Sequence, residues 1–158
     1  APEDLERLSA AASIRAAIER YPFANDEERA LVRLDESQDF EFLGSEVMFT
    51  HVIFNLLKNA VYYVAEAGKG EISVWLEPQA DGYNCIHIMD TGTGIAPNIL
   101  PRIFDRFFTS MSQGRGSGIG LAFCKMVMES FGGSISCESE QGVFTRFALT
   151  FPPVPVDG

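Results

Sequence analysis

The chain has 158 residues, of which 46% are hydrophobic, and a formal net charge of −10. This length fits one domain, and the apolar content suffices for a core, which argues against disorder. The acidic balance argues against a nucleic-acid-binding protein or a basic membrane-surface module. No apolar run approaches the roughly 20 residues of a membrane helix. Three cysteines without a CxxC pair argue against metal–thiolate chemistry and indicate reduced thiols in a cytosolic compartment.

Hydrophobic periodicity and turn residues predict the elements along the chain. In chain order these are a helix at 3–20, short strands at 30–34 and 39–43, a long helix at 45–66, a hairpin at 71–90, a short helix within 98–105, a helix at 118–131, and paired strands at 134–138 and 143–151. Ser45 is the expected N-cap of the long helix, and Gly68 its stop. The proline-rich segment 152–158 reads as a linker or terminus.

Two asparagines mark the long helix. Asn55 and Asn59 are four residues apart, so both side chains lie on one helix face. Polarity of the helix surface or a mutual side-chain contact would explain them. The functional alternative is a metal–phosphate site, because an amide oxygen is a hard ligand that suits Mg²⁺.

An acidic residue ends the second strand of the 71–90 hairpin. Asp90 has the same parity as Ile86 and Ile88, which places its carboxylate on the buried side, where it must be paired or hydrogen-bonded. Thr91-Gly-Thr-Gly94 follows and allows close backbone approach to a ligand. A salt-bridged strand end would explain Asp90; the functional alternative is a carboxylate that accepts a hydrogen bond from a ligand's amine.

Alternating glycines occupy positions 114 to 120 and lead directly into a helix. Bare amides at a helix N-terminus suit an anion, above all phosphate. The segment lacks the Lys-Ser/Thr of a P-loop, and no strand precedes it at the distance of a Rossmann turn. The basic residues Arg102, Arg106 and Arg115 lie in this otherwise acid-poor region.

Four ordered motifs together resemble those of a known family. They are His51 to Tyr63 (N box), Asp90 to Pro97 (G1 box), Ile103 to Thr109 (F box) and Gly114 to Leu121 (G2 box). The sequence is similar to the ATP-binding catalytic domain of sensor histidine kinases, within the Bergerat-fold group that includes gyrase, Hsp90 and MutL. The resemblance implies an α/β (α+β) two-layer sandwich, in which a mixed, mostly antiparallel sheet of about five strands packs on about three helices and carries an ATP lid.

The resemblance also implies residue roles. Asn59 would ligate Mg²⁺ at the ATP phosphates with Asn55 beside it, both counted as catalytic, and Asp90 would accept a hydrogen bond from the adenine amino group. Tyr63 would lie against the base, and Phe104 and Phe107 would anchor the lid. The other residues implied to bind the nucleotide are Gly92, Gly94, Ile95, Arg106, Arg115, Gly116, Ser117, Gly118, Ile119, Gly120 and Leu121.

The identity of residue 55 distinguishes between hydrolysis and phosphoryl transfer. ATPases of the group usually carry a Glu four residues before the metal-binding Asn, whereas Asn55 cannot act as a general base. This favours phosphoryl transfer over hydrolysis. Two positions depart from the family pattern: Tyr62 stands where a basic residue often contacts a phosphate, and Met111 stands where a Lys follows the F box. Lys58, Arg106 or Arg115 would then supply the charge.

The phosphoacceptor is missing from this sequence. Only His51 and His87 are present, and neither has the context of an acceptor histidine. We therefore expect a catalytic domain at 23–151, preceded at 1–22 by a helical connection from a dimerisation domain and the first helix, and unable to autophosphorylate alone. The isolated domain would be a monomer, the parent a homodimer that passes phosphate to a response regulator or receiver domain, and the location cytoplasmic, with any membrane anchor elsewhere. The alternatives are an ATPase or clamp of the gyrase–MutL type and a non-catalytic nucleotide-binding scaffold.

Overall fold

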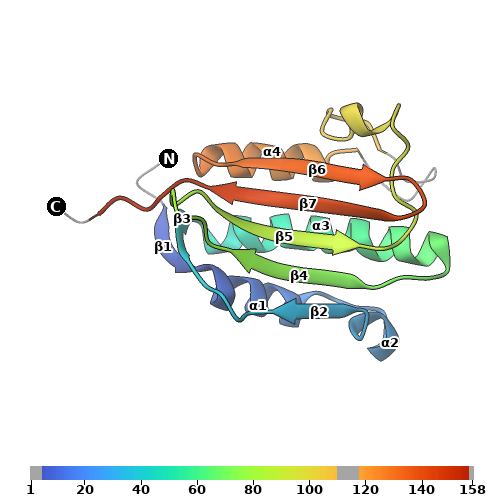
Figure 1. Cartoon of the computed structure of the whole chain (residues 1–158), viewed down its shortest axis with the longest axis horizontal. Helices are drawn as coiled ribbons and strands as arrows, with labels where there is room; N and C mark the ends of the chain where they lie inside the picture. The colour runs from blue at the N-terminus through green and yellow to red at the C-terminus, as the bar shows by residue number, and fades with distance from the viewer. Residues whose placement is uncertain (1–4, 110–117, 157–158) are drawn as a thin grey trace.

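A computed structural model describes residues 5–109 and 118–156. A five-stranded sheet with the strand order β2-β4-β5-β7-β6 has α1, α3 and α4 on one face (Figure 1). The elements are β1 (Glu6–Ser9), α1 (Ala10–Arg20), α2 (Asp26–Arg29), β2 (Val32–Asp35), β3 (Glu41–Gly44), α3 (Glu46–Ala67), β4 (Ile72–Glu77), β5 (Asn84–Asp90), η2 (Leu100–Arg102), α4 (Gly120–Ser130), β6 (Ser134–Glu140) and β7 (Phe144–Phe151).

The sheet confirms the predicted mixed, mostly antiparallel architecture. β2 runs parallel to β4, whereas the pairs β4–β5, β5–β7 and β6–β7 are antiparallel. Both predicted hairpins are present, and the second turns at 141–143, where Glu140 pairs with Phe144. The predicted ATP lid falls largely within 110–117, outside the described residues.

The long helix α3 has the predicted signals at both ends. The Ser45 hydroxyl oxygen accepts a hydrogen bond from the Met48 amide at 3.3 Å, as an N-cap does. At the other end Gly68 adopts the left-handed conformation with φ of 66°, which costs a glycine little. α3 packs against α1, α4 and the inner face of β5, so it is the central support of the molecule.

The N-terminal region differs from the prediction. Residues 6–9 form β1, which pairs antiparallel with β3 in a separate two-stranded sheet, so the helix begins only at Ala10. Ser9 caps that helix by accepting a hydrogen bond from the Ala12 amide at 3.1 Å. The predicted short helix within 98–105 is the single 3₁₀ turn η2, and α2 was not predicted.

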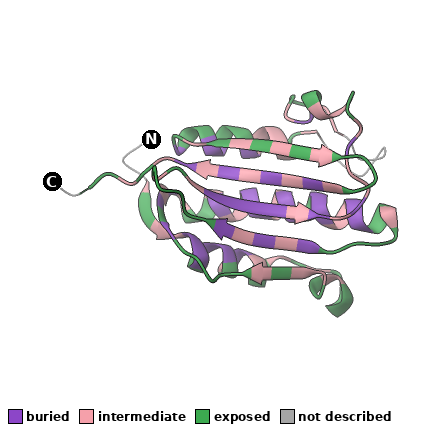
Figure 2. Ribbon diagram, viewed as in Figure 1, coloured by how far each residue is buried: buried purple, intermediate pink, exposed green. Residues whose placement is uncertain are grey.

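The core lies between the sheet and the helices, where the buried residues of both layers meet (Figure 2). Phe42, Phe49 and Phe151 form an aromatic cluster in it, with ring centroids of Phe42 4.4 Å from Phe151 and 5.1 Å from Phe49. Such aromatic pairs add to the stabilisation that burial provides. None of the described helices has the length and hydropathy needed to span a bilayer.

Candidate nucleotide-binding site

The two asparagines of α3 present their amide oxygens in the same way. Each side-chain nitrogen donates a hydrogen bond to the carbonyl four residues earlier, Asn55 to His51 and Asn59 to Asn55, both at 2.9 Å. Because the nitrogens are held by the helix backbone, the Oδ1 atoms remain as acceptors. Asn59 is only 8% exposed, so its oxygen is a fixed, partly desolvated ligand.

Asp90 lies at the end of β5 and is 2% exposed. Its side chain faces the helices, as the alternation predicted, and Oδ1 accepts a hydrogen bond from the Gly92 amide at 3.0 Å. Burial raises the pKa of this carboxyl to about 7, and the Gly92 hydrogen bond only partly offsets that effect. A buried carboxylate with spare acceptor capacity is suited to a ligand donor.

The part of the G1 box that follows Asp90, residues 91–97, is called the G1 loop. It is held between α3 and the β6–β7 hairpin. A Cβ at Gly92 would lie 2.5 Å from the backbone carbonyl of Tyr63, so only glycine permits this approach. The Thr93 amide donates to the Tyr63 carbonyl at 3.3 Å, and the Gly142 amide donates to the Thr93 carbonyl at 2.6 Å. Farther on, the Ile95 amide donates to the Ser139 hydroxyl at 2.8 Å.

The N-terminus of α4 lies beside Asn55. A Cβ at Gly120 would come within 2.5 Å of Asn55 Oδ1, and Ile119 provides no side-chain cap for the helix. The first amides of α4 therefore have no side-chain acceptor among the described residues, an arrangement that suits an anion. Asn55, Arg106, Ile119 and Gly120 line one cleft of about 820 Å³.

The F box contacts the G2 box at Phe107 and Gly118. The Phe107 amide donates to the Gly118 carbonyl at 2.6 Å, and Gly118 packs so tightly on the Phe107 backbone that a Cβ could not fit. Phe107 has the left-handed φ of 68°, rare for a non-glycine residue, and its ring is 71% exposed. Phe107 and Gly118 are therefore in direct contact, although eleven positions separate them in the sequence.

These residues fit a magnesium nucleotide. Mg²⁺ keeps most of its waters and needs only one or two protein oxygen ligands beside the phosphates, so Asn59 Oδ1, with Asn55 Oδ1 one turn away, is a suitable donor set. The positively charged Arg106 and the uncapped amides of α4 lie near Asn55. The G1 loop, which directly follows Asp90, lies near Tyr63, two turns farther along α3.

The structure brings together several of the residues implied by the resemblance, and it adds detail for four others. Tyr63 is 2% exposed and belongs to the core, so its backbone rather than an open ring face borders the G1 loop. The Phe107 backbone contacts Gly118, whereas the Phe104 ring packs edge-on against the Phe147 ring, with 6.2 Å between the ring centroids. Leu121 is half-buried against the core. Arg115, Gly116 and Ser117 lie outside the described residues.

Four residues that the sequence analysis gave no role in nucleotide binding line the cleft beside Asn55. They are His51, Met48, Phe123 and Met126. Their spacing of three or four residues along each helix was the available signal. Thr145 is fully buried and pairs with Asp90 across β5 and β7. Only the strand register, which depends on tertiary pairing, identifies Thr145 as a neighbour of Asp90.

Known proteins resemble this chain in sequence. The family model of histidine kinase-, DNA gyrase B- and HSP90-like ATPases matches residues 44–155. The CAI-1 autoinducer sensor kinase/phosphatase CqsS of Vibrio cholerae is 40% identical over 96% of this chain and 21% of its own length. The autoinducer 1 sensor kinase/phosphatase LuxN of Vibrio campbellii is 39% identical over 97% of this chain and 18% of its own length. The chain thus spans about a fifth of these relatives.

Solved structures show the same fold. The mycobacterial sensor histidine kinase MprB superposes with a TM-score of 0.73 at 25% identity, covering 95% of this chain and 99% of that one. Full-length ShkA in complex with AMPPNP superposes with a TM-score of 0.76 at 23% identity, covering 98% of this chain and 32% of that one. With the family model matching well over half of its length, this chain belongs to the histidine kinase-, DNA gyrase B- and HSP90-like ATPase family, and its fold is that of a sensor-kinase catalytic domain.

Proposed function

We propose that this chain binds Mg-ATP and is the catalytic part of a protein-histidine kinase. It would transfer the γ-phosphoryl group to a histidine on a dimerisation domain outside this chain. The family match supports ATP as the ligand, and sensor kinases match nearly the whole chain.

The described side chains give each part of the nucleotide a partner. Asp90 would accept from the adenine amino group, and the amides of α4 with Arg106 would bind the phosphates. Asn59, with Asn55 beside it, would hold Mg²⁺, which supplies positive charge where the transferred phosphoryl group carries negative charge. The chain itself therefore positions the donor and leaves the attacking group to a partner.

The observation that carries the choice of reaction is the identity of residue 55. Asn55 uses its nitrogen on the His51 carbonyl and has no basic atom with which to activate water. The described residues that line the adjacent cleft include no carboxylate. The site therefore favours transfer to a nucleophile that a partner presents over hydrolysis.

Neither histidine has the environment of an acceptor. His87 is 7% exposed on the opposite face of the sheet from the helices, and its Nε2 is hydrogen-bonded to Glu77 Oε1 at 2.7 Å. His51 lies in the cleft, but on the same helix as Asn55. The half-buried and exposed apolar residues Met48, Ile119, Phe123 and Met126 beside it suit contact with an apolar helix of the acceptor domain.

Labelled phosphate transfer tests the proposal. The chain is incubated with ATP labelled in the γ-phosphate and Mg²⁺, alone and with the histidine-bearing helices of its parent protein. We expect acid-labile label on the helices, and none on this chain. A phosphorylated response regulator of the same system would then be the expected downstream product.

Two variants sharpen this experiment. Asn59→Ala should abolish transfer, whereas His51→Gln should keep it, because His51 is not the acceptor. Label on this chain that disappears in His51→Gln would contradict the proposal. Steady-state hydrolysis of ATP by the chain alone, at a rate above transfer, would instead support the ATPase alternative.

A further inference from the structure

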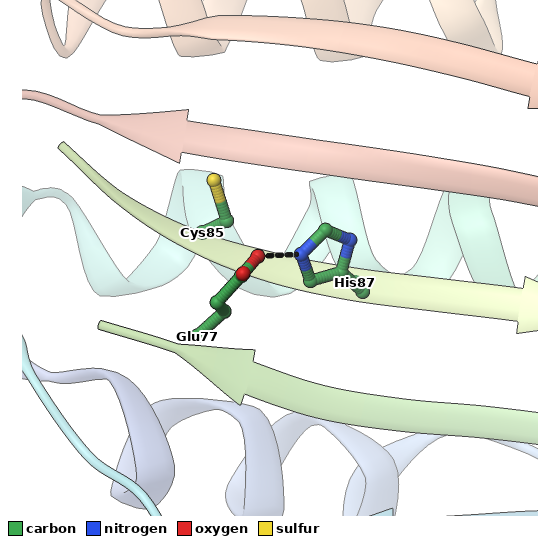
Figure 3. Close-up of side chains that lie close together, drawn as sticks. All are labelled: Glu77, Cys85 and His87. Atoms are coloured by element: carbon green, nitrogen blue, oxygen red, sulfur yellow. Dashed lines mark hydrogen bonds and ion pairs between the residues drawn. The ribbon is translucent and has the colours of Figure 1, made fainter. Parts of the chain in front are cut away.

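The outer face of the sheet carries a second group of ligand-type side chains, far from the nucleotide site. In the β4–β5 register Glu77 pairs directly with Cys85, and His87 follows Cys85 by two residues on the same face. Ile86, Ile88 and Asp90 point to the helices, so these three side chains point away from them (Figure 3). Strand pairing alone therefore brings Glu77, Cys85 and His87 together.

The three donor atoms are close enough to share one ion. One carboxylate oxygen, the thiol sulfur and one ring nitrogen all lie within 4.8 Å of one another. In a tetrahedral zinc site, the donor atoms lie roughly 3.4–3.6 Å apart, as the bond lengths to sulfur, nitrogen and oxygen require. Glu77 Oε1 and His87 Nε2, now 2.7 Å apart, would separate by less than about 1 Å.

Two of the three side chains are buried, and the third is exposed to solvent. Cys85 and His87 are 6% and 7% exposed, whereas the Glu77 side chain is about half exposed. The two soft ligands are thus fixed by the sheet, and the carboxylate can move to admit an ion from solvent. His87 is further held by Trp75, whose ring stacks on it at 4.8 Å with an interplanar angle of 15°.

Two neighbouring polar groups contact the sulfur of Cys85. Gln79 Nε2 donates to Cys85 Sγ at 3.5 Å, and the Thr150 hydroxyl lies 3.3 Å from the same sulfur. Donors around a ligating sulfur orient it and tune its affinity. On His87, the described residues provide no hydrogen-bond partner for Nδ1, so the polar contact of the ring is made on the side of the cluster, through Nε2.

We propose that Glu77, Cys85 and His87 bind one divalent transition-metal ion of the zinc type, with water as the fourth ligand. Cysteine, histidine and carboxylate ligands together suit Zn²⁺, while Mg²⁺ prefers oxygen alone. On binding, a metal–sulfur bond forms and the thiol proton passes to solvent. A neutral His87 would bind through Nε2 and carry its ring proton on Nδ1, so that one proton, that of the thiol, is released per ion. The ion would link β4 to β5, the strand that ends in Asp90.

Titration of the reduced chain with Co²⁺, followed by displacement with Zn²⁺, tests this site. A thiolate ligand gives a cobalt charge-transfer absorption, and we expect it to saturate at one ion per chain. Cys85→Ser should abolish the band. Glu77→Gln and His87→Gln should each weaken Co²⁺ binding at least about tenfold. Zn²⁺ should also raise the melting temperature of the original chain, and much less that of Cys85→Ser.

Matched controls separate this site from the other thiols and from the nucleotide site. Cys137→Ser on β6 should keep the band, as should Asp90→Asn. Circular dichroism establishes the folding of each variant, and Glu77→Gln changes a side chain that is about half exposed. The proposal is overturned if no charge-transfer band forms, if the band survives Cys85→Ser, or if Glu77→Gln and His87→Gln, both folded, bind Co²⁺ as the original chain does.

Discussion

Asp90 makes nucleotide affinity and stability depend on pH in opposite directions. Its pKa of about 7 in the folded chain lies above the ordinary 3.8, because burial disfavours the charge. The stability that the protonated group contributes is complete below pH 3.8 and is lost as the pH rises toward about 7. The ionised form, which accepts from adenine, instead becomes available as the pH rises through 7.

Asp90→Asn should remove both pH dependences, because an amide does not titrate. At pH 8 we expect the variant to melt at a higher temperature than the original chain, with the difference vanishing near pH 4, since the amide oxygen can still accept from Gly92. ATP affinity at pH 8 should fall roughly 10- to 100-fold, because a hydrogen bond to a charged group is lost. Calorimetry and thermal melts between pH 5 and 8 measure the two quantities.

Asp90→Asn also controls for the change in protonation of the ATP phosphates with pH. Affinity of the original chain, relative to Asp90→Asn, should decline from pH 8 to pH 6, and the phosphates of ATP cancel in that ratio. The exposed Asp105 serves as a second control. Its Oδ2 atom lies 3.7 Å from Arg102 Nε. A ratio independent of pH, or an equal loss in Asp105→Asn, would contradict the role of Asp90.

Asn59 should affect the phosphates and not the base. Asn59→Ala removes the oxygen proposed to hold Mg²⁺, so we expect about tenfold or greater loss of Mg-ATP affinity with unchanged adenosine affinity. Thr50→Ala is the matched control, because Thr50 also donates to the carbonyl four residues earlier on α3, at 2.8 Å. Equal loss for adenosine and Mg-ATP, measured calorimetrically, would show that Asn59 acts through the fold instead.

At the scale of elements, a substitution where α3 and α4 meet should lower nucleotide affinity without lowering the stability of the fold. Gly120→Ala places a Cβ 2.5 Å from Asn55 Oδ1, so the Asn55 side chain must shift. Alanine favours a helix by roughly 0.5–1 kcal/mol over glycine, so the melting temperature should hold or rise. Mg-ATP affinity should fall about tenfold through the displaced Asn55 and the narrowed helix N-terminus.

The exposed Glu129 provides the control on the same helix. Glu129→Ala lies at the far end of α4, and we expect unchanged nucleotide affinity in thermal-shift titration. If Gly120→Ala binds Mg-ATP as the original chain does, the close contact between the G2 box and the N box has no bearing on the nucleotide.

Elements with local signals were predicted well, whereas those made by distant pairing were not. α3 has a cap, a stop and a regular apolar face, all visible in sequence. Leu5, Leu8 and Ala12 have a spacing that also fits a helix, and only pairing with residues 41–44 makes residues 6–9 a strand. α2 has no buried residue, so no apolar pattern marks it.

In the candidate site, too, features with a local sequence signal were predicted, and features made by distant contacts were not. The parity of β5 was enough to predict that Asp90 is buried. The left-handed backbone of Phe107 comes from its contact with Gly118, and the grouping of Glu77 with Cys85 comes from strand register. A search for CxxC pairs misses a ligand set in which Cys85 and His87 share one strand and the third ligand comes from its neighbour.

At the scale of the whole molecule, α1 shares the core of the nucleotide-binding unit. Ala10, Ile14 and Ala17 are fully buried in the same cluster as the inner face of α3. Asp39 ties the start of α1 to the segment before β3, since its carboxylate accepts from the Ala11 amide and the Ser9 hydroxyl, both at 2.9 Å. We therefore propose that residues 10–20 fold with the rest rather than as a separate connection ending at residue 22.

Ile14→Ala tests this unity directly. If α1 shares one cooperative core, removing buried methyl groups from it should lower the free energy of unfolding by about 2–5 kcal/mol, as Ile53→Ala on α3 should. Arg15→Ala is the control on α1, because its guanidinium is about half exposed and contacts Glu36 at the surface, so the urea midpoint should not change. Urea unfolding followed by fluorescence and by circular dichroism should give coincident single transitions for all three variants. A separate early transition in Ile14→Ala, or a midpoint equal to that of Arg15→Ala, would mean that α1 is a detachable connection, and Mg-ATP would then raise only the later transition.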